Sequence, residues 1–285
     1  MTDPFADLRR TVLAPSDAAD ALRLSAEAGW NQTDADWRFM ARKGHGWGLR
    51  DPGGRLVATA LTLPYGRFAW IGMLLVTLDH RRRGIATALL RRCLDHLVSR
   101  DLIPALDATE AGRKVYLRLG FEDVYGITRM RAEAVARGGG ETAGLRPIEP
   151  ADLDSLFAFD RTAFGADRSA VLAYLLERRP DRGFAAFRDG VLVGYVLARA
   201  GRQAHHLGPL AAVDEATAVG LASRALADLE GLVTIDSLDR HAGFNRWLAA
   251  RGFAPERPFT RMILGRRSPF DDPGRIFAIA GPELG

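Results

Sequence analysis

The stretch that decides the fold is WIGMLLVTLDHRRRGIAT, residues 70–87. Residues 70–76 form an apolar run that predicts a buried strand, and apolar side chains recur at helical spacing from Ile85 to Val98. Between them lie three arginines and Gly84. The start of a helix leaves backbone N–H groups unpaired and carries the positive end of the helix dipole. The sequence therefore predicts an anion site, suited to a diphosphate, at this turn, although the G-x-x-x-x-G-K-[ST] pattern of a P-loop is absent.

The composition indicates an ordinary globular protein. The chain has 285 residues, 47% hydrophobic and 26% charged, which is enough for about two domains. The net charge is +4, and the basic residues are interspersed with acidic ones along the chain. No nucleic-acid partner is therefore expected. The polar opening MTDPFADLRR shows no signal peptide, and no apolar run approaches the ~20 residues of a membrane span. With Cys93 as its one cysteine, the chain is expected to be cytoplasmic, with no membrane association.

An internal repeat organises the chain. LVA at 56–58 returns as LVG at 192–194, and GML at 72–74 returns as GPL at 208–210, both after 136 residues. Further on, GF and TRM recur after 132 residues, from 120–121 to 252–253 and from 128–130 to 260–262. Two constant spacings separated by one short deletion indicate two copies of one domain.

The repeat predicts a first domain over residues 1–135, a linker over 136–143 and a second domain over 144–285. The linker ARGGGETA is rich in glycine and poor in apolar residues, as flexible connections are. The tail over 266–285 lies beyond the repeated unit. In the first copy the pattern predicts helices over 16–28, 33–42, 85–98 and 112–119, and strands over 46–49, 55–63, 68–76, 102–106 and 123–131. This order predicts an α+β domain built on a mixed sheet.

Two motifs in the first copy resemble those of the GNAT superfamily of acetyl-CoA-dependent N-acetyltransferases. Arg81-x-x-Gly84-x-Ala86 follows an apolar strand, as in the family's R/Q-x-x-G-x-G/A signature. Residues 109–121, TEAGRKVYLRLGF, resemble its N-x-x-A-x-x-L-Y-x-x-L-G-F, with Thr109 in place of Asn and Gly112 in place of Ala. The tandem layout, WNQT at 30–33 and GPELG at 281–285 resemble a bacterial two-GNAT subgroup of unassigned substrate.

The resemblance implies two tandem GNAT acyl-CoA N-acyltransferase domains and transfer of an acetyl group to a primary amine of a small-molecule acceptor. In the family the strand before the turn pairs with the pantetheine arm of acetyl-CoA, and the turn's amides hold the pyrophosphate. Tyr116 matches the tyrosine that protonates the departing CoA thiolate, unless it only packs its short helix. The residues thereby assigned to acetyl-CoA are Leu74, Leu75, Val76, Arg81, Arg82, Arg83, Gly84, Ile85, Ala86 and Thr87.

The general base and the acceptor site are less defined. Some relatives carry a glutamate where this chain has Trp70, so Asp107, at the end of the next strand, is the candidate base, or else an N-cap or an ammonium-binding group. Trp30 and Asn31 lie between the first two helices and are assigned to the acceptor wall. Cys93 falls on the apolar face of its helix and is expected in the core. No cluster of metal-ligand spacing occurs, so no metal is expected.

The second copy lacks the charged turn. At the 136-residue spacing, residues 81–86 become TAVGLA at 217–222, and Leu248 stands where Tyr116 stands. This copy is therefore expected to be degenerate and structural. His206 stands at the position of the second copy that corresponds to Trp70. It is expected to be a core or surface residue rather than a ligand-facing one.

Two other readings remain open. The chain could be a non-catalytic acyl-CoA or metabolite-binding module of GNAT-like fold. It could also resemble the actinobacterial tandem-GNAT synthases of thiol conjugates, although in those the active half is C-terminal. The sequence does not identify the acceptor, the acyl length, the oligomeric state or the role of the tail.

Overall fold

The structure is a computed structural model that describes residues 5, 7–133, 144–227 and 229–285. The linker predicted over 136–143 lies outside the described residues. The chain forms two compact units, which we describe separately. Unit 1 comprises Met1–Leu106 with the short loop Gly201–Gln203, and unit 2 comprises Asp107–Ala200 with Ala204–Gly285.

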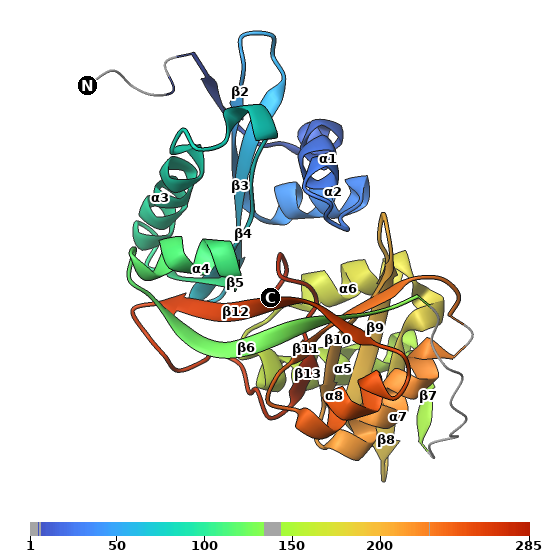
Figure 1. Ribbon diagram of the computed structural model, residues 1–285. Helices are drawn as coiled ribbons and strands as arrows, with labels where there is room; N and C mark the ends of the chain where they lie inside the picture. The colour runs from blue at the N-terminus through green and yellow to red at the C-terminus, as the bar shows by residue number, and fades with distance from the viewer. Residues whose placement is uncertain (1–4, 6, 134–143, 228) are drawn as a thin grey trace. The chain divides into compact units, whose positions relative to one another are not determined.

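Unit 1 is a sheet with helices on both faces. Its strands are ordered β1-β2-β3-β4-β5, all antiparallel neighbours except the parallel pair of β4 and β5. Helix α3 packs on β3 and β4 from one side, and α1 packs on the same two strands from the other (Figure 1). The elements are β1 (Arg9–Val12), α1 (Ala18–Glu27), α2 (Asp34–Lys43), β2 (His45–Arg50), β3 (Leu56–Tyr65), β4 (Phe68–Val76), α3 (Ile85–Val98) and β5 (Ile103–Thr109), whose last residues belong to unit 2.

Local sequence signals account for these boundaries. Thr33 caps α2, because its hydroxyl accepts the Asp36 amide while the Asp36 carboxylate accepts the Thr33 amide at 2.7 Å. Trp37 is fully buried and donates its indole N–H to Ser25 of α1, 3.1 Å away, so it joins the two helices rather than lining a pocket. The buried residues of α3 are Ile85, Leu89, Leu90, Cys93 and Leu97, so Cys93 lies in the core as expected, whereas Val98 at the end of the helix is exposed.

Unit 2 carries the rest of the first copy together with the second copy. Its sheet is ordered β12-β6-β11-β13-β10-β9-β8-β7. The elements are α4 (Glu110–Leu117), β6 (Phe121–Ala132), β7 (Leu145–Pro147), α5 (Leu153–Phe164), α6 (Ser169–Arg178), β8 (Phe184–Arg188), β9 (Val191–Ala200), β10 (His205–Ala212), α7 (Glu215–Leu226), β11 (Val233–Leu238), α8 (Ala242–Ala249), β12 (Ala254–Leu264) and β13 (Ile276–Ala278).

The alternation of side chains along β9 shows how unit 2 is layered. Val196 and Ala198 belong to the core cluster that also holds the buried face of α7. Tyr195, which directly precedes Val196 in the strand, is buried on the opposite face and bonds Asp160 of α5. Successive side chains of a strand point to opposite faces, so helices cover both sides of this sheet.

The last strand of each copy pairs with an unexpected partner. In sequence β6 ends the first copy, but in the structure it lies between β11 and β12 of the second. It is antiparallel to both, with Met130 opposite Ile235 of β11 and Ile127 opposite Phe259 of β12. The compact units therefore do not coincide with the two sequence copies, because a strand of the first copy is built into the sheet of the second.

The tail beyond the repeat also enters this sheet. It supplies β13, which lies between β10 and β11 and is antiparallel to both. Within the described part of the chain, no helix is long and apolar enough to cross a membrane.

Candidate functional site

The turn between β4 and α3 forms a pocket in unit 1. A cavity of about 210 Å³ lies at this turn. It is lined by Val76, His80, Arg81, Arg82, Gly84, Ile85, Ala86 and Thr87. Seven of these eight are residues that the sequence assigned to the cofactor, and they come from the end of β4, the turn and the first turn of α3. The sequence analysis did not assign His80 to the cofactor, because it lies one residue before the motif and matches no motif position.

The backbone of the turn is shaped for close approach to a ligand. Arg82 has φ +63° and Gly84 has φ +81°, so two of the three residues 82–84 occupy the left-handed region. A Cβ at Gly84 would meet nothing within 4 Å, which means that the conformation, and not crowding, requires glycine there. Left-handed residues in a tight turn direct backbone N–H groups into a shared concavity, the geometry that binds anions.

The N-terminus of α3 has no side-chain cap. Gly84 is its N-cap residue and its first turn contains no acidic residue. The amide of Ala88 is the first to bond within the helix, to Gly84 at 3.0 Å. The amides before it belong to the set that a helix leaves without an intrahelical partner, and no acidic side chain of the first turn competes with an anion for them.

The arginines of the turn differ in what they contact. Arg81 donates its Nε to the Val76 carbonyl, 3.1 Å away, and so ties the turn to the end of β4. Arg83 instead forms an ion pair with Asp7 at 2.7 Å, which lowers the pKa of that carboxyl, and it is not among the residues lining the pocket. Arg81 and Arg82 are therefore the charged side chains of the pocket, with Arg83 directed to the N-terminal segment.

The strand that leads into the turn contains a bulge. The pairing of β3 with β4 shifts between Thr59 and Leu61, and Met73 has φ +53°. The Thr59 hydroxyl donates to the Met73 carbonyl at 2.8 Å and holds the bulge. A bulge re-aims the backbone that follows it, here Leu74 to Val76. Leu75 is buried, whereas Leu74 and Val76 are half-buried.

In unit 2, Tyr116 lies on α4, packed over the start of its own helix. Its ring is 5.9 Å from that of Phe121. A Cβ at Gly112 would come within 2.9 Å of the Tyr116 ring, so glycine stands there, where the family motif has alanine, because the ring occupies the space. Thr109 accepts the Gly112 amide at 3.3 Å and caps α4. Both departures from the motif thus have a local structural reason.

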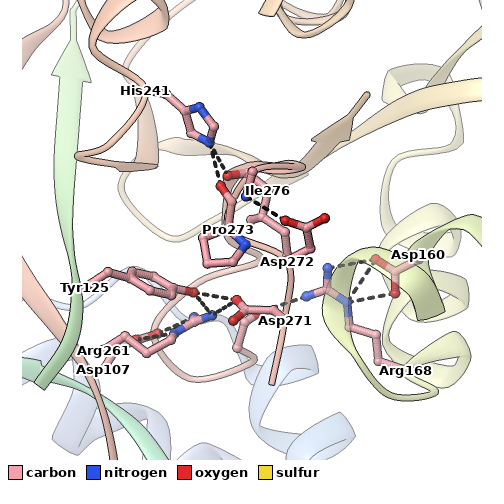
Figure 2. A network of polar contacts seen from close by, with 12 residues as sticks. Asp107, Tyr125, Asp160, Arg168, His241, Arg261, Asp271, Asp272, Pro273 and Ile276 are labelled. Carbon is pink, nitrogen blue, oxygen red and sulfur yellow. Dashed lines mark hydrogen bonds and ion pairs between the residues drawn. The ribbon is translucent and has the colours of Figure 1, made fainter. Parts of the chain in front are cut away.

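Asp107 is held in a buried ion pair. Its two carboxylate oxygens accept from Nε and Nη2 of Arg261, each at 3.0 Å, and both side chains are buried (Figure 2). Arg261 also bonds Asp271, 2.7 Å away, and Tyr125. Burial raises the pKa of Asp107, and Arg261 opposes that rise. Since both oxygens are engaged in a closed network, the structure does not support Asp107 as a general base.

The second copy repeats this ion pair, which identifies its role. Counted along the paired strands, Asp236 of β11 takes the position of Asp107 in β5, and Arg129 takes that of Arg261. Arg129 donates Nε and Nη2 to the two Asp236 oxygens, each at 2.7 Å. In each pair the arginine of one copy binds the aspartate of the other. The pair is present in the copy that lacks the charged turn, so it stabilises the strand arrangement.

Trp30 and Asn31 face a loop of their own unit. The Trp30 carbonyl accepts from the Arg202 guanidinium at 3.1 Å, and the Asn31 carbonyl accepts the Arg202 amide at 2.8 Å. The Asn31 side chain also accepts the Gln203 amide at 2.8 Å. Both residues are half-buried, and the contacts around them are those of a fixed loop.

Unit 2 has a further hollow, which was not predicted as a pocket although four of its residues lie in the motif at 109–121. It measures about 530 Å³ and is lined by Thr109, Glu110, Ala111, Lys114, Arg257 and Pro258. Its basic residues come from α4 and β12, which are far apart in sequence. Lys114 is one of two lysines in a chain that otherwise uses arginine, and the motif at 109–121 was the other signal for this region.

The remaining candidate residues are placed as expected or carry no site. Cys93 is buried, which raises the pKa of its thiol to about 12. Leu248 and His206 are both buried in unit 2. Among the residues that the structure describes, no three His, Cys, Asp or Glu side chains gather as metal ligands.

Comparison with protein families gives two matches. Residues 16–121 match the model of the Acetyltransferase (GNAT) family, and residues 156–278 match that of an Acetyltransferase (GNAT) domain. Together they cover most of the chain, one in each sequence copy.

Individual proteins are similar over nearly the whole length. The chain is 24% identical over 266 residues to the uncharacterized N-acetyltransferase YitH of Bacillus subtilis (strain 168), covering 93% of this chain and 94% of that protein. It is 27% identical over 226 residues to the holothin acyltransferase of Pseudoalteromonas sp. (strain SANK 73390), covering 76% and 74%. The crystal structure of a proposed acetyltransferase from Pyrococcus horikoshii superposes with a TM-score of 0.81 at 20% identity, covering 99% and 97%.

Proposed function

This chain belongs to the GNAT family of N-acyltransferases, and from that premise we propose that it transfers an acetyl group from acetyl-CoA to a primary amine of a small molecule. The observation that carries the proposal is the pocket at the N-terminus of α3, where uncapped helix amides, left-handed Gly84 and the arginines Arg81 and Arg82 line one cavity. A polyphosphate is the ligand that such a site stabilises.

The residues present fit the donor. Arg82 and the first turn of α3 would hold the pyrophosphate. Leu74 to Val76, beyond the bulge, would offer backbone groups to the pantetheine arm, because β4 pairs with β5 only as far as Trp70. Acetyl-CoA supplies an activated thioester, whose carbonyl carbon the acceptor nitrogen attacks.

The chain contributes orientation and proton transfer to this reaction. A backbone N–H of β4 polarises the thioester carbonyl as negative charge develops on its oxygen. When the carbon–sulfur bond breaks, the Tyr116 hydroxyl gives its proton to the departing thiolate. As the new carbon–nitrogen bond forms, the amine gives one proton to water, and a proton from water restores the Tyr116 hydroxyl, so that CoA leaves as the thiol. Asp107 is not carried forward as the base, since Arg261 occupies both of its oxygens.

The similar proteins support an acyl acceptor of the amine class. YitH is named an N-acetyltransferase, and the relative from Pseudoalteromonas is named for acyl transfer to holothin. Trp30 and Asn31 are retained as acceptor-side residues, with their main-chain and amide groups fixed by the loop 201–203. We propose that the acceptor is a small-molecule amine and that the protein is cytoplasmic.

Calorimetric titration of acetyl-CoA tests the proposal. Wild type is expected to bind one equivalent. Gly84→Asp is expected to abolish binding, because a side chain at φ +81° strains the turn and its carboxylate repels a phosphate. Arg82→Gln is expected to weaken binding roughly 10- to 100-fold, the value of one charge-assisted contact of ~1.5–3 kcal/mol.

The matched control is Arg91→Gln, which removes the same charge from an exposed position on the same helix. It is expected to bind within about threefold of wild type, as screened surface charges do. Equal weakening by Arg82→Gln and Arg91→Gln would show a general effect of charge, and the absence of binding in wild type would refute the proposed donor.

A further inference from the structure

The two copies can be compared at the same strand positions. In the first copy, β4 and β5 pair in parallel only where residues 68–70 face 103–105. In the second copy, β10 and β11 pair in parallel only where residues 205–207 face 233–235. Both strand pairs thus separate after a stretch of three paired residues, one residue later in the second copy at the 136-residue spacing of the repeat.

What lies beyond that point in the second copy is the chain's own tail. Leu210 and Ala211 of β10 pair with Ala278 and Ile276 of β13, and Ser237 of β11 also pairs with Ala278. At the 136-residue spacing of the repeat, Leu210 and Ala211 correspond to Leu74 and Leu75. The backbone that the proposed function assigns to acetyl-CoA in the first copy is therefore paired with β13 in the second.

The fit between β10 and the tail is close. Gly208 has φ +153°, and a Cβ there would lie 2.1 Å from the Ile279 carbonyl oxygen. The Ile279 amide donates to the Asp236 carbonyl at 3.1 Å, and the Ser237 hydroxyl donates to the Phe277 carbonyl at 3.2 Å. We call the space between β10 and β11, beyond the residues where they pair, the slot of the second copy. The tail therefore bonds both strands that border this slot.

Side chains hold the tail on both sides of β13. His241 contacts the carbonyls of Pro273 and Ile276 through Nε2, at 2.9 and 2.8 Å (Figure 2). Its ring stacks on Phe277 with centroids 3.9 Å apart. Further along, Arg199 forms a buried ion pair with Glu283.

The ends of the tail are anchored by buried arginines. Asp271 is bonded by Arg261 and Tyr125, in the network that also holds Asp107 (Figure 2). Arg168, itself buried and paired with Asp160, donates to the Gly285 carbonyl at 2.7 Å. Residues 276–280 are all buried. Residues 276–280 are therefore part of the folded core rather than a loosely bound surface segment.

The helix beside this slot is also closed to an anion. α7 begins at Glu215, six residues earlier than its counterpart α3 does in the repeat, so residues equivalent to the charged turn lie within the helix. Asp214 caps α7 by accepting the Thr217 amide at 2.8 Å, and Glu215 adds a second negative charge. A phosphate at this N-terminus would meet two carboxylates in place of two arginines.

We propose that the tail, residues 270–285, is the permanent occupant of the acyl-donor slot in the second copy, so that the chain takes acyl-CoA in the first copy alone. This rests on the proposed function for the identity of the donor. The occupation of the slot by β13 stands on the strand pairing by itself. In the second copy, β13 occupies the slot in place of a ligand and completes the core of unit 2.

A disulfide tether tests whether the tail stays in place. Ser237 and Ala278 are directly paired across antiparallel strands, so Ser237→Cys with Ala278→Cys brings two thiols within bridging reach. Cys93 is buried and does not compete. The oxidised double variant is expected to bind one equivalent of acetyl-CoA, with affinity and turnover within about twofold of its reduced form. The single variants serve as controls.

Hydrogen exchange supplies a readout that does not depend on acetyl-CoA. The Ile279 amide is expected to exchange as slowly as those of β10 and β11, and to change by less than about twofold when acetyl-CoA is added. A second equivalent in wild type that the tether removes would overturn the proposal, and so would fast exchange over 276–279. If wild type binds no acetyl-CoA while these amides remain protected, the proposed donor fails and the occupation of the slot stands.

Discussion

At the scale of single residues, the pocket depends on backbone conformation as much as on charge. Gly84 and Arg82 adopt positive φ and open the turn, whereas neighbouring Arg83 leaves the pocket to bind Asp7. Three adjacent arginines thus have separate roles that their identical chemistry does not reveal. On α4, Gly112 makes room for the Tyr116 ring, and this fixes the tyrosine's position on its helix.

The role of Tyr116 can be separated from its packing. Tyr116→Phe keeps the ring on Gly112 and removes only the hydroxyl, so the fold and the acetyl-CoA affinity are expected to be retained. Loss of a general acid lowers kcat by roughly 10²–10⁴-fold. Steady-state kinetics with an accepted amine, beside calorimetry, measure both quantities.

The control removes a hydroxyl of the same kind elsewhere in the unit. Tyr174 lies on α6, where its hydroxyl accepts from Arg178 at 3.3 Å. Tyr174→Phe is expected to leave kcat within about twofold, because Tyr174 lies on α6 and does not line the pocket at the turn. A Tyr116→Phe enzyme that turns over as fast as this control would exclude Tyr116 as the acid.

At the scale of elements, the deciding feature is the exchange of strand partners. β6 pairs with β11 along residues 233–238 and with β12 along 254–264. Buried, bidentate Arg129–Asp236 and Arg261–Asp107 pairs accompany the exchange. Removing one partner of such a pair leaves an uncompensated charge in the core, which is more costly than the net value of the pair itself.

The contact between β10 and the tail makes stability depend on pH through His206. Burial lowers the pKa of His206 to about 4; Asp236 and Glu283 oppose this effect, while Arg199 and Arg129 add to it. Between pH 6.5 and 4 the imidazole is protonated only in the unfolded chain. That proton stabilises the unfolded state, so stability falls as the pH is lowered through this range and changes no further from this group below pH 4.

From pH 7 to pH 5 the loss due to His206 amounts to about 2 kcal/mol. Urea unfolding at both pH values, for wild type and for His206→Leu, is expected to show a pH dependence smaller by that amount in the variant. The other histidines contribute equally to both proteins and cancel in the difference. His205→Gln is the neighbouring control. Burial also lowers the pKa of His205, but this side chain is only half-buried, so a smaller reduction is expected, and an equal one would contradict the assignment to His206.

At the scale of the whole molecule, the sequence linker does not separate two independent halves. A protease site placed in residues 136–143 would cut between the copies, but β6 stays paired with β11 and β12. After cleavage in native buffer, the two fragments are expected to elute together in size-exclusion chromatography. They should separate in about 6 M guanidinium, which unfolds most domains.

Fragments that separate in native buffer would contradict the exchange of strands. For the same reason, residues 1–135 expressed alone are expected to aggregate, because β6 would expose both of its unpaired edges. Uncut protein carrying the same protease site is the control, since it reports any effect of the insertion itself.

The sequence by itself indicated the repeat, most elements of the first copy and the position of the turn before α3, whereas it did not predict β1 or β13. These rest on local rules: apolar periodicity defined α3 at its observed bounds, and the start of a helix has unpaired amides wherever it occurs. The family matches agree with the two GNAT copies that the motifs predicted. The same local rules gave β4 with its observed ends.

Only the tertiary structure decided which strands pair. Both copies carry an aspartate in the fifth strand and an arginine in the last, so Arg129 and Arg261 are each chemically suited to either Asp107 or Asp236. With two equivalent arginines and two equivalent aspartates, the sequence does not specify whether each ion pair forms within one copy or between the two copies. Asp107 therefore resembled a free carboxylate near an active site, when long-range packing had placed it against the other copy's arginine.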